Sequence, residues 1–600
     1  MFKNKVKIKY DARIHIAFII IALCFIFMIG KLAWMQILNQ GYYEKKIRKQ
    51  SSRVTILKAS RGNIYDRNHK ILAYNRPCFD LILNNKNIKK VELTNYVDKI
   101  SDLLEISTNQ IWKNINSKQR GNYDPIVFAY DIDRETVIKL AEDFISLPYV
   151  DFEISSVREY PFSNIFCHVV GYIGKIYEKH PRINSSGYSS LDIVGITGIE
   201  AAFDEHLHGK NGKKIIEVDR KQEVTTVLEE TPPEHGKDIV LTIDSNLQQY
   251  FYEAISGKVG AVVAMNPRNG EVLAMLSSST FDPNLFVKGI SAKDYNDLHS
   301  NTNFPFFNRA LEGLYPLGSV FKIITAMAGL ESKKLKVDDI YNDTGSFQLW
   351  DKKKISNFNN MHYGQIKLRR ALRVSCNTFF CYYSTLIGID RLNEMACNFG
   401  FGDFTGIAMP RERRGVVPNN KWKIAAINSG WRQGDTVNLS IGHGFLLVTP
   451  IQVACMISAF ANEGTWLPPK IEKTETIETK NSLTWHSKKN PYTVPVNLTN
   501  LNYINTCMHD VVNDREGSAY RSKLSNNIIM AGKTGSAEVR KGKTYAWFAA
   551  FAPFDNPEIA VAIVVEWAKT GGTDAAPIAK AALDKYFADK LNINNKLNNR

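Results

Sequence analysis

Residues 315–322 read YPLGSVFK, and apolar side chains follow at helical spacing as far as Leu330. On a helix, side chains three residues apart lie on the same face, so the amine of Lys322 can reach the hydroxyl of Ser319. A serine hydroxyl becomes a good nucleophile when an adjacent base takes its proton. A lysine can be that base where burial and nearby positive charge lower its pKa. The stretch therefore predicts a helix that opens with a nucleophilic serine and its base.

Two short motifs downstream carry related chemistry. They are SCN at residues 375–377 and KTGS at residues 533–536, the second followed by a strand-like apolar pattern. Each is weak alone, since residues 525–527 (SNN) also fit the first pattern and read more simply as a polar loop. Together and in this order, the three motifs resemble the active sites of penicillin-binding proteins and serine β-lactamases.

The resemblance implies a role for each residue of the first two motifs. Ser319 is the expected nucleophile, which attacks the carbonyl of the penultimate D-alanine in a peptidoglycan stem peptide, and Lys322 is its general base. Ser375 relays the proton to the leaving amine, and Asn377 holds the amide of the substrate. Release of the terminal D-alanine leaves an acyl-enzyme.

The third motif implies the part of the site that binds the donor peptide. Lys533 adds positive potential, and Thr534 together with Ser536 binds the terminal carboxylate. Gly535 is expected to leave room for substrate along the edge of the strand. The main-chain N–H groups of Ser319 and Ser536 form the expected oxyanion hole, in which the loss of one donor typically costs about 2.7–4 kcal/mol.

Residues 61–73 (RGNIYDRNHKILA) predict a hairpin and resemble the segment near the membrane in class B penicillin-binding proteins. The sequence before residue 240 shows no sign of the glycosyltransferase domain of a class A protein. No Glu-x-x-Leu-Asn segment supplies the deacylating carboxylate of a class A β-lactamase. An acyl-enzyme without that base waits for the amine of a second stem peptide. The resemblance thus implies a serine-type D,D-transpeptidase that β-lactams acylate, with D-Ala-D-Ala carboxypeptidase as a side activity.

Within class B, residues 315–322 and 434–450 resemble the elongation-type enzymes, which serve cell-wall growth and cell shape. One alternative is a division-type transpeptidase, whose members more often have Glu-Pro-Gly-Ser before the lysine. The other is a catalytically silent β-lactam sensor or scaffold. Sensors carry several transmembrane helices and a cytoplasmic protease domain, neither of which the sequence shows. Acylation by a fluorescent penicillin would separate a scaffold from an enzyme.

Residues 14–35 form one apolar stretch, about 33 Å long as a helix, which is enough to cross a bilayer core. Basic residues precede it at positions 3, 5, 7, 9 and 13. The positive-inside rule therefore predicts a cytoplasmic tail at residues 1–13 and export of everything after the helix. Since no small-x-small cleavage site follows, we expect an uncleaved, single-pass anchor in the bacterial inner membrane with the catalytic domain in the periplasm.

The rest of the chain predicts an α+β protein with two exported domains. Residues 36–237 indicate an extended, strand-rich pedestal of the dimerisation type, without catalytic residues, which ends in a Pro-rich linker. Residues 238–588 indicate a penicillin-binding, β-lactamase-like transpeptidase domain, in which strands from both ends form one antiparallel sheet around a helical middle. Residues 589–600 are rich in Asn and Lys and predict a flexible tail.

The net charge of +16 does not indicate a nucleic-acid partner, because the basic residues are scattered and no aromatic residues are interleaved with them. An exported basic protein is attracted instead to anionic lipid and to acidic polymers. The eight cysteines form no paired framework and are expected to be free thiols. The resemblance implies four partners: stem peptides, β-lactam antibiotics, the lipid bilayer, and a membrane-embedded glycan polymerase of the shape, elongation, division and sporulation family.

A metal site is a weaker hypothesis, and no other cofactor is expected. His362 precedes the SCN motif, and Asp343, Asp351 and Cys376 are companions of the types that bind zinc. The alternative reading is a loop histidine beside a buried thiol.

Overall fold

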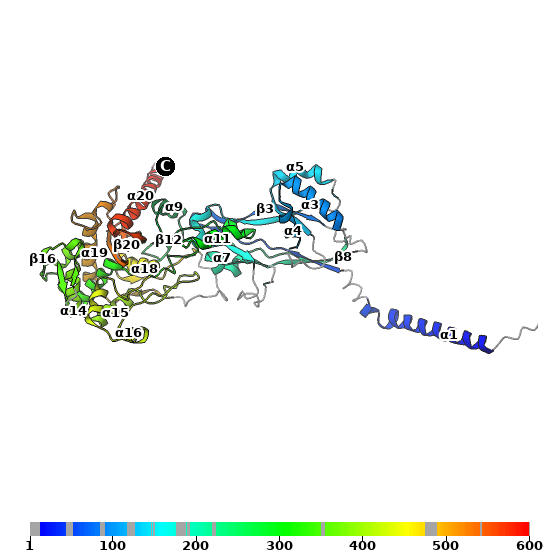
Figure 1. Ribbon diagram of the computed structural model, residues 1–600, viewed down its shortest axis with the longest axis horizontal. Helices are drawn as coiled ribbons and strands as arrows, with labels where there is room; N and C mark the ends of the chain where they lie inside the picture. Colours follow the sequence, from blue (N-terminus) through cyan, green and yellow to red (C-terminus); the bar gives the residue numbers. More distant parts are fainter. Residues whose placement is uncertain are drawn as a thin grey trace, which may run out of the picture.

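The computed structural model describes residues 12–43, 52–83, 90–116, 126–145, 147, 150–175, 188, 192–218, 224–349, 354–473, 489–540 and 543–598. The molecule is elongated (Figure 1). Helix α1 lies at one end, a strand-rich module follows, and a larger domain of helices around a sheet forms the other end. This arrangement confirms the predicted α+β architecture with one N-terminal apolar helix.

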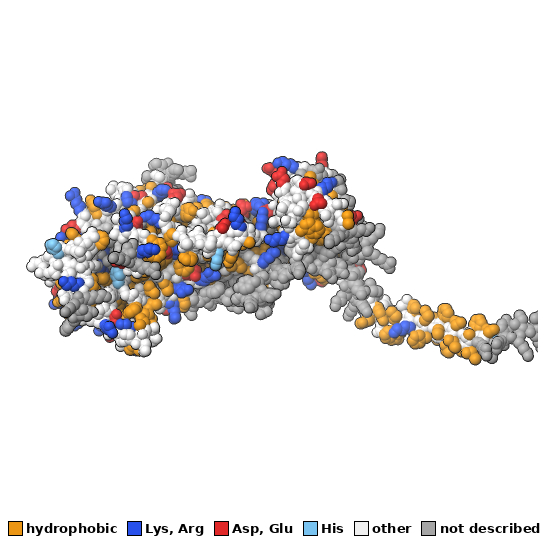
Figure 2. Space-filling model, viewed as in Figure 1, with side chains coloured by type: hydrophobic (Ala, Val, Ile, Leu, Met, Phe, Trp, Pro, Cys, Tyr) orange, Lys and Arg blue, Asp and Glu red, His pale blue; other side chains and the backbone are white. Residues whose placement is uncertain are grey.

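Helix α1 (Ala12–Ala33) continues into a π-helical turn at Trp34–Leu38. Its large apolar side chains are exposed (Figure 2), and the described remainder of the chain does not cover them. A helix that is apolar all round and lies outside the protein core is typical of a membrane span, and residues 14–38 are long enough for one. Lys31 Nζ lies 4.1 Å from the centroid of the Trp34 ring, at the end where an interfacial aromatic residue is expected.

The strand-rich module, called the pedestal below, contains two main sheets. The first is an antiparallel ribbon of β1 (Ser52–Leu57), β8 (Gly212–Val218) and β9 (Val224–Thr231). The second contains β2 (Ile64–Tyr65), β3 (Ile71–Leu83), β4 (Ile126–Ile132) and β5 (Val150–Glu159), and β3 pairs with the other three. The hairpin predicted for residues 61–73 is confirmed by β2 and β3. A short pair of β6 (Ile173–Lys175) and β7 (Ile193–Gly195) lies beside helices α6 (Cys167–Val170), α7 (Gly198–Ala202) and α8 (Asp204–His208).

Three helices form a small head on the pedestal (Figure 1): α3 (Lys90–Leu104), α4 (Thr108–Asn116) and α5 (Arg134–Ile145). Buried residues such as Val97 and Ile111 pack there against Phe128 of β4. The prediction for this region is an extended, strand-rich module, and it does not include these helices. The sequence nevertheless carries a signal for α3, because Leu93, Val97, Ile100 and Leu104 recur at helical spacing and pack on one face.

The larger domain is built on a five-stranded antiparallel sheet with the order β12-β11-β21-β20-β19. Strands β11 (Gly260–Met265) and β12 (Val272–Ser278) come from the start of the domain. Strands β19 (Ala531–Arg540), β20 (Lys543–Ala552) and β21 (Ile559–Ala568) come from its end. The two ends of the domain therefore meet in one sheet, as predicted. Strand β10 (Ile239–Val240) pairs in parallel with β2 of the pedestal and so joins the two domains.

Helices cover both faces of this sheet. Residues of α9 (Ser245–Ala254) and α20 (Ala576–Asn598) pack on one face, and residues of α18 (Pro450–Ala461) and α12 (Lys322–Glu331) share the core on the other. The helical middle also contains α13 (Leu368–Arg373), α14 (Asn377–Ile387), α15 (Ile389–Asn398), α16 (Asn420–Ile427), α17 (Gln433–Ser440) and α19 (Leu498–Asn513).

The C-terminal helix is longer than expected. The sequence predicts a flexible tail from residue 589, but α20 continues to Asn598. Two contacts hold this part of the helix: Tyr250 donates a hydrogen bond to Asp589, and Lys590 pairs with Glu558. These partners lie far away in the sequence, so local composition does not reveal them.

Candidate active site

Ser319 lies in a 3-10 turn (η3, Gly318–Phe321), and Lys322 is the first residue of α12. The serine is thus not on the regular α-helix that the sequence predicts. Because side chains three residues apart eclipse each other in a 3-10 turn, Ser319 and Lys322 still share a face. The turn packs directly on β19, since a Cβ on Gly318 would lie 2.9 Å from the carbonyl oxygen of Ser536. The first and third motifs are therefore in contact.

The amine of Lys322 is fully buried and donates three hydrogen bonds to the second motif. They go to the Ser375 carbonyl oxygen at 2.7 Å, to Ser375 Oγ at 3.1 Å and to Asn377 Oδ1 at 2.7 Å. Burial lowers the pKa of Lys322 to about 8. A substantial fraction of the amine is consequently neutral near physiological pH, as a general base requires.

A second buried amine lies on the other side of Ser375. Lys533 Nζ donates to Ser375 Oγ at 2.9 Å and to the carbonyl oxygen of Thr534 at 3.0 Å. Burial first, and then the positive charge of Lys322, lower the pKa of Lys533 well below its usual value. Ser375 Oγ thus bridges two amines that resist simultaneous protonation, which is an arrangement suited to passing a proton.

The turn that presents the second motif depends on Asn357, which sequence reasoning misses. Its side chain is buried, and its Oδ1 accepts hydrogen bonds from the backbone N–H groups of Asn377 at 2.7 Å and Thr378 at 3.2 Å. Its Nδ2 donates to Asp343 at 2.9 Å. Ser375 itself has φ of 58°, in the left-handed region, so the backbone needs such support to hold this shape. A lone Asn in a loop gives no sequence signal for this role.

Strand β19 places Thr534 and Ser536 of the third motif on one face and Lys533 and Gly535 on the other. Thr534 Oγ1 lies 2.6 Å from Ser518 Oγ, and Ser536 Oγ accepts a hydrogen bond from the N–H of Gly571 at 3.1 Å. The structure gives a second reason for Gly535 besides the predicted one. A Cβ there would lie 2.8 Å from the Leu317 carbonyl oxygen, so the missing side chain also makes room for the segment that carries Ser319.

The zinc candidates do not converge among the described residues. No group of three or more His, Cys, Asp or Glu residues that could hold a metal is present in the described ranges, and Asp351 lies outside them. His362 is exposed, whereas Asp343 already accepts hydrogen bonds from Asn357, Thr378, Gly345 and Tyr363. Cys376 Sγ lies 3.2 Å from Thr378 Oγ1. The described donor set thus does not fit a zinc ion, and we assign no step to a metal.

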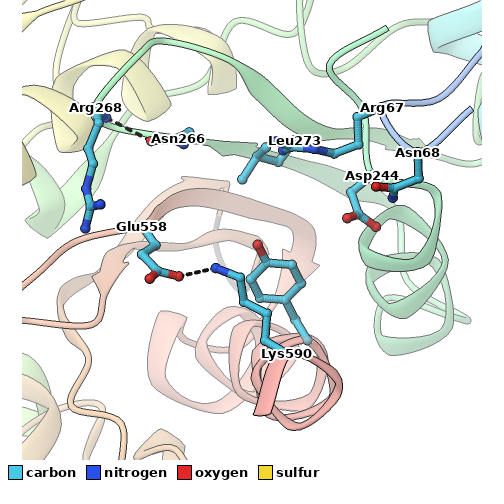
Figure 3. A pocket seen from close by; sticks show the side chains of 9 residues that line it. Arg67, Asn68, Asp244, Asn266, Arg268, Leu273, Glu558 and Lys590 are labelled. Atoms are coloured by element: carbon cyan, nitrogen blue, oxygen red, sulfur yellow. Dashed lines mark hydrogen bonds and ion pairs between the residues drawn. The ribbon is translucent and has the colours of Figure 1, made fainter. Parts of the chain in front are cut away.

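A separate pocket of about 340 Å³ lies where the pedestal meets the larger domain (Figure 3). Arg67 from the pedestal and Arg268, Glu558 and Lys590 from the larger domain line it. Two of its basic residues are paired with carboxylates, since Lys590 pairs with Glu558 and Arg67 pairs with Glu271 at 3.3 Å, and Arg268 donates to the carbonyl oxygen of Pro557 at 2.9 Å. Figure 3 shows none of the three motifs among the residues drawn, so this pocket is distinct from the cluster around Ser319.

Two protein-family descriptions match this chain. Residues 56–241 match the penicillin-binding protein dimerisation domain, and residues 260–584 match the penicillin-binding protein transpeptidase domain. The chain is 32% identical to the peptidoglycan D,D-transpeptidase MrdA of Acinetobacter baumannii, over 96% of this chain and 88% of that protein. It is 31% identical to MrdA of Escherichia coli K12, over 92% of this chain and 90% of that protein.

Solved structures show the same fold. The penicillin-binding protein PBP2 of Helicobacter pylori, in a complex with MreC, superposes with a TM-score of 0.80 at 28% identity, covering 90% of this chain and 99% of that one. PBP2 of Pseudomonas aeruginosa superposes with a TM-score of 0.66 at 31% identity, covering 89% of this chain and 96% of that one. The chain therefore belongs to the penicillin-binding protein family, in the class that joins a dimerisation domain to a transpeptidase domain.

Proposed function

We propose that this chain is a peptidoglycan D,D-transpeptidase that cross-links stem peptides through an acyl-enzyme on Ser319. Neutral Lys322 takes the hydroxyl proton as Ser319 Oγ attacks the carbonyl carbon of the penultimate D-alanine. The proton passes through Ser375 to the nitrogen of the terminal D-alanine, whose C–N bond breaks. The amine of a second stem peptide then attacks the ester carbonyl, forms the new amide and returns a proton to the serine oxygen.

One observation carries this proposal: Ser375 Oγ lies within 3.1 Å of Lys322 Nζ and 2.9 Å of Lys533 Nζ, beside the turn that bears Ser319. The fold thereby brings together a general base (Lys322), a proton relay (Ser375) and a second positive charge (Lys533) from three distant parts of the chain. The N–H groups of Ser319 and Ser536 belong to the two segments in contact at Gly318, which supports their role as oxyanion donors.

We further propose that the enzyme serves cell-wall elongation at the inner membrane. The support is the similarity to MrdA proteins over nearly the whole chain and the apolar helix at residues 14–38. The basic residues before that helix favour a cytoplasmic N-terminus and a periplasmic catalytic domain. Fusing a reporter that is active only in the periplasm after residue 598 tests this orientation, and an inactive fusion in a stable protein would contradict it.

Two partners follow from this role. The Helicobacter pylori relative was solved with MreC, so a protein of that kind is a candidate partner of this chain. The second is a membrane-embedded glycan polymerase, because the matched domains make cross-links and not glycan strands. Replacing residues 1–40 with an unrelated anchor should weaken copurification and stimulation of the polymerase and leave penicillin acylation unchanged. Normal stimulation by the swapped protein would place the contact in the pedestal alone.

The nucleophile is tested by labelling the full-length protein with a fluorescent penicillin, followed by peptide mass spectrometry. The adduct should map to Ser319, and Ser319→Ala should remove it while the protein stays folded and membrane-bound. Ser525→Ala is the matched control, since Ser525 lies outside the three motifs and its hydroxyl donates a hydrogen bond to the carboxylate of Asp584 at 2.9 Å. An adduct on another residue would overturn the assignment. Analysis of the cross-links that the parent protein forms then separates an enzyme from a silent scaffold.

A further inference from the structure

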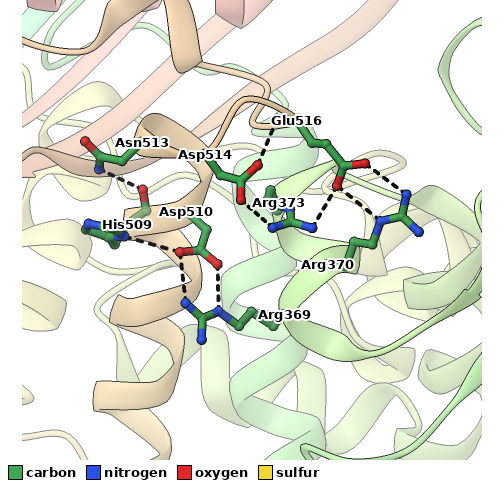
Figure 4. A network of polar contacts seen from close by, with 8 residues as sticks. All are labelled: Arg369, Arg370, Arg373, His509, Asp510, Asn513, Asp514 and Glu516. Carbon is green, nitrogen blue, oxygen red and sulfur yellow. Dashed lines mark hydrogen bonds and ion pairs between the residues drawn. The ribbon is translucent and has the colours of Figure 1, made fainter.

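A cluster of ion pairs ties the second motif to the segment before β19 (Figure 4). Helix α13 ends at Arg373, two residues before Ser375. The guanidinium of Arg373 contacts Asp514 at 2.6 Å and Glu516 at 2.7 Å. Arg370, one turn earlier, contacts the same Glu516 at 3.0 Å. Several charge-assisted bonds on one short segment hold it more firmly than a single surface pair would.

Main-chain bonds fix the same segment. The N–H of Ser518 donates to the carbonyl oxygen of Arg373 at 3.3 Å, and the N–H of Ala519 donates to that of Val511 at 3.0 Å. A Cβ on Gly517 would lie 2.3 Å from the Val511 carbonyl oxygen, so the chain runs tightly against the end of α19. Residues 514–518 are thus anchored at both ends and carry Ser518 to a defined place.

Ser518 lies beside the third motif. Ser518 Oγ lies 2.6 Å from Thr534 Oγ1, and this is the hydrogen bond that the structure gives to the Thr534 hydroxyl among the described residues. Thr534 is 6% exposed, whereas Ser518 is exposed at the surface. The side chain of Ser518 therefore fills no part of the core, and its distance to Thr534 needs another explanation than packing.

The hydroxyl pair has two arrangements. If Thr534 donates to Ser518, its only proton is spent; if Ser518 donates, the proton of Thr534 is free to point away. A carboxylate accepts hydrogen bonds and cannot donate them, so its arrival selects the second arrangement. A hydroxyl that already accepts one hydrogen bond also donates a stronger one.

We propose that Ser518 is a positioning residue of the donor-carboxylate site: it donates to Thr534 Oγ1 so that Thr534 donates to the terminal carboxylate of the donor peptide. The ion pairs of Arg373 with Asp514 and Glu516 hold Ser518 in reach. This inference rests on the proposed function, because it takes the carboxylate to be that of a stem peptide or of the β-lactam that replaces it. It adds a residue outside the three motifs to the part of the site that recognises charge.

The experiment compares two probes on the full-length protein: a penicillin with its free carboxylate and the methyl ester of the same penicillin. In Ser518→Ala, the second-order acylation rate for the free acid should fall by about tenfold, as expected for a weakened bond to a charged group. The rate for the ester should change by less than about twofold, because the ester lacks the anion. Ser518→Thr should keep the rates of the parent protein.

Two further variants complete the design. Asp514→Ala should show the same selective loss as Ser518→Ala, because it loosens the segment, and Ser525→Ala should show none. An equal fall for acid and ester in Ser518→Ala, or no fall at all, would overturn the proposal. Failure of the proposed function looks different, since the parent protein itself would then carry no adduct on Ser319.

Discussion

The pedestal and the active site both bury charged side chains, but the bonding partners of those side chains differ. In the pedestal, Glu200 contacts Arg61 at 2.5 Å and Arg158 at 2.8 Å, with its side chain fully buried. In the active site, Lys322 and Lys533 are equally buried, and among the described residues they bond to hydroxyl, amide and carbonyl oxygens rather than to carboxylates.

The pKa values follow from this difference. Burial alone would raise the pKa of Glu200, but the charges of Arg158 and Arg61 outweigh it and lower the pKa. The carboxylate therefore stays charged and holds the pedestal segments together. Burial lowers the pKa of Lys322 and Lys533, and within the described ranges no carboxylate bonds to either amine to restore it. In the pedestal, a buried carboxylate that is paired with arginines stabilises the fold. In the active site, a buried lysine without a paired carboxylate has a lowered pKa and can act as a base.

The largest effect is expected at Lys322. Lys322→Arg keeps a positive charge but cannot deprotonate at neutral pH, so acylation of Ser319 should fall by about 10²–10⁴-fold, the usual contribution of a general base. The measurement is stopped-flow acylation with a fluorescent penicillin, with a thermal melt to show that the variant is folded. An acylation rate near that of the parent protein would mean that another group activates the serine.

Glu200→Gln should lower the stability of the protein without slowing acylation, which is the opposite of what we expect for Lys322→Arg. It leaves two buried arginines without their shared carboxylate, and the free energy of unfolding should fall by about 3–5 kcal/mol. Acylation per folded molecule should stay unchanged. Glu229→Gln is the matched control: its pair with Lys213 is about half exposed, so its loss should cost less than about 1 kcal/mol. Denaturant titrations give the stability, and a change in Glu200→Gln no larger than in the control would remove the contrast between the two regions.

A smaller effect is expected at Asn357. Asn357→Ala leaves the N–H groups of Asn377 and Thr378 without their acceptor and should cost about 1–3 kcal/mol. Acylation should also slow by about tenfold, because Ser375 and Asn377 lose their fixed positions. Gln365→Ala, at an exposed position on β16 (Gly364–Ile366), serves as control. If stability falls without any change in acylation, Asn357 supports the fold and not the relay.

The smallest effect is expected from metal removal. Asp343 and Cys376 already have protein partners, so dialysis against a chelator should change neither the melting temperature nor the acylation rate. Elemental analysis of the purified protein should find no stoichiometric zinc. One zinc per chain, lost together with stability on chelation, would show that Asp351 or another residue outside the described ranges completes a metal site.

The sequence predicts the parts of this molecule that depend on local pattern. The three motifs, the apolar helix, the hairpin at residues 61–73 and the strands from both ends of the catalytic domain are each visible in short stretches. The helical spacing of Leu93, Val97 and Ile100 already indicates the head helix α3, whereas the end of α20 is missed because its partners are distant in sequence. The partners of the motifs are missed for the same reason, since Asn357 and Ser518 are ordinary loop residues until the fold places them beside Asn377 and Thr534.

The central claim is that burial without a counter-charge makes Lys322 a base, and the pH dependence of acylation tests it most directly. Since neutral Lys322 is the active form, the second-order acylation rate of the full-length protein should rise about tenfold per pH unit at low pH and level off above an apparent pKa of about 8. Lys322→Arg should lose this dependence together with the rate. A parent profile that is flat through this range, or that rises only towards the ordinary lysine value of 10.5, would contradict the account.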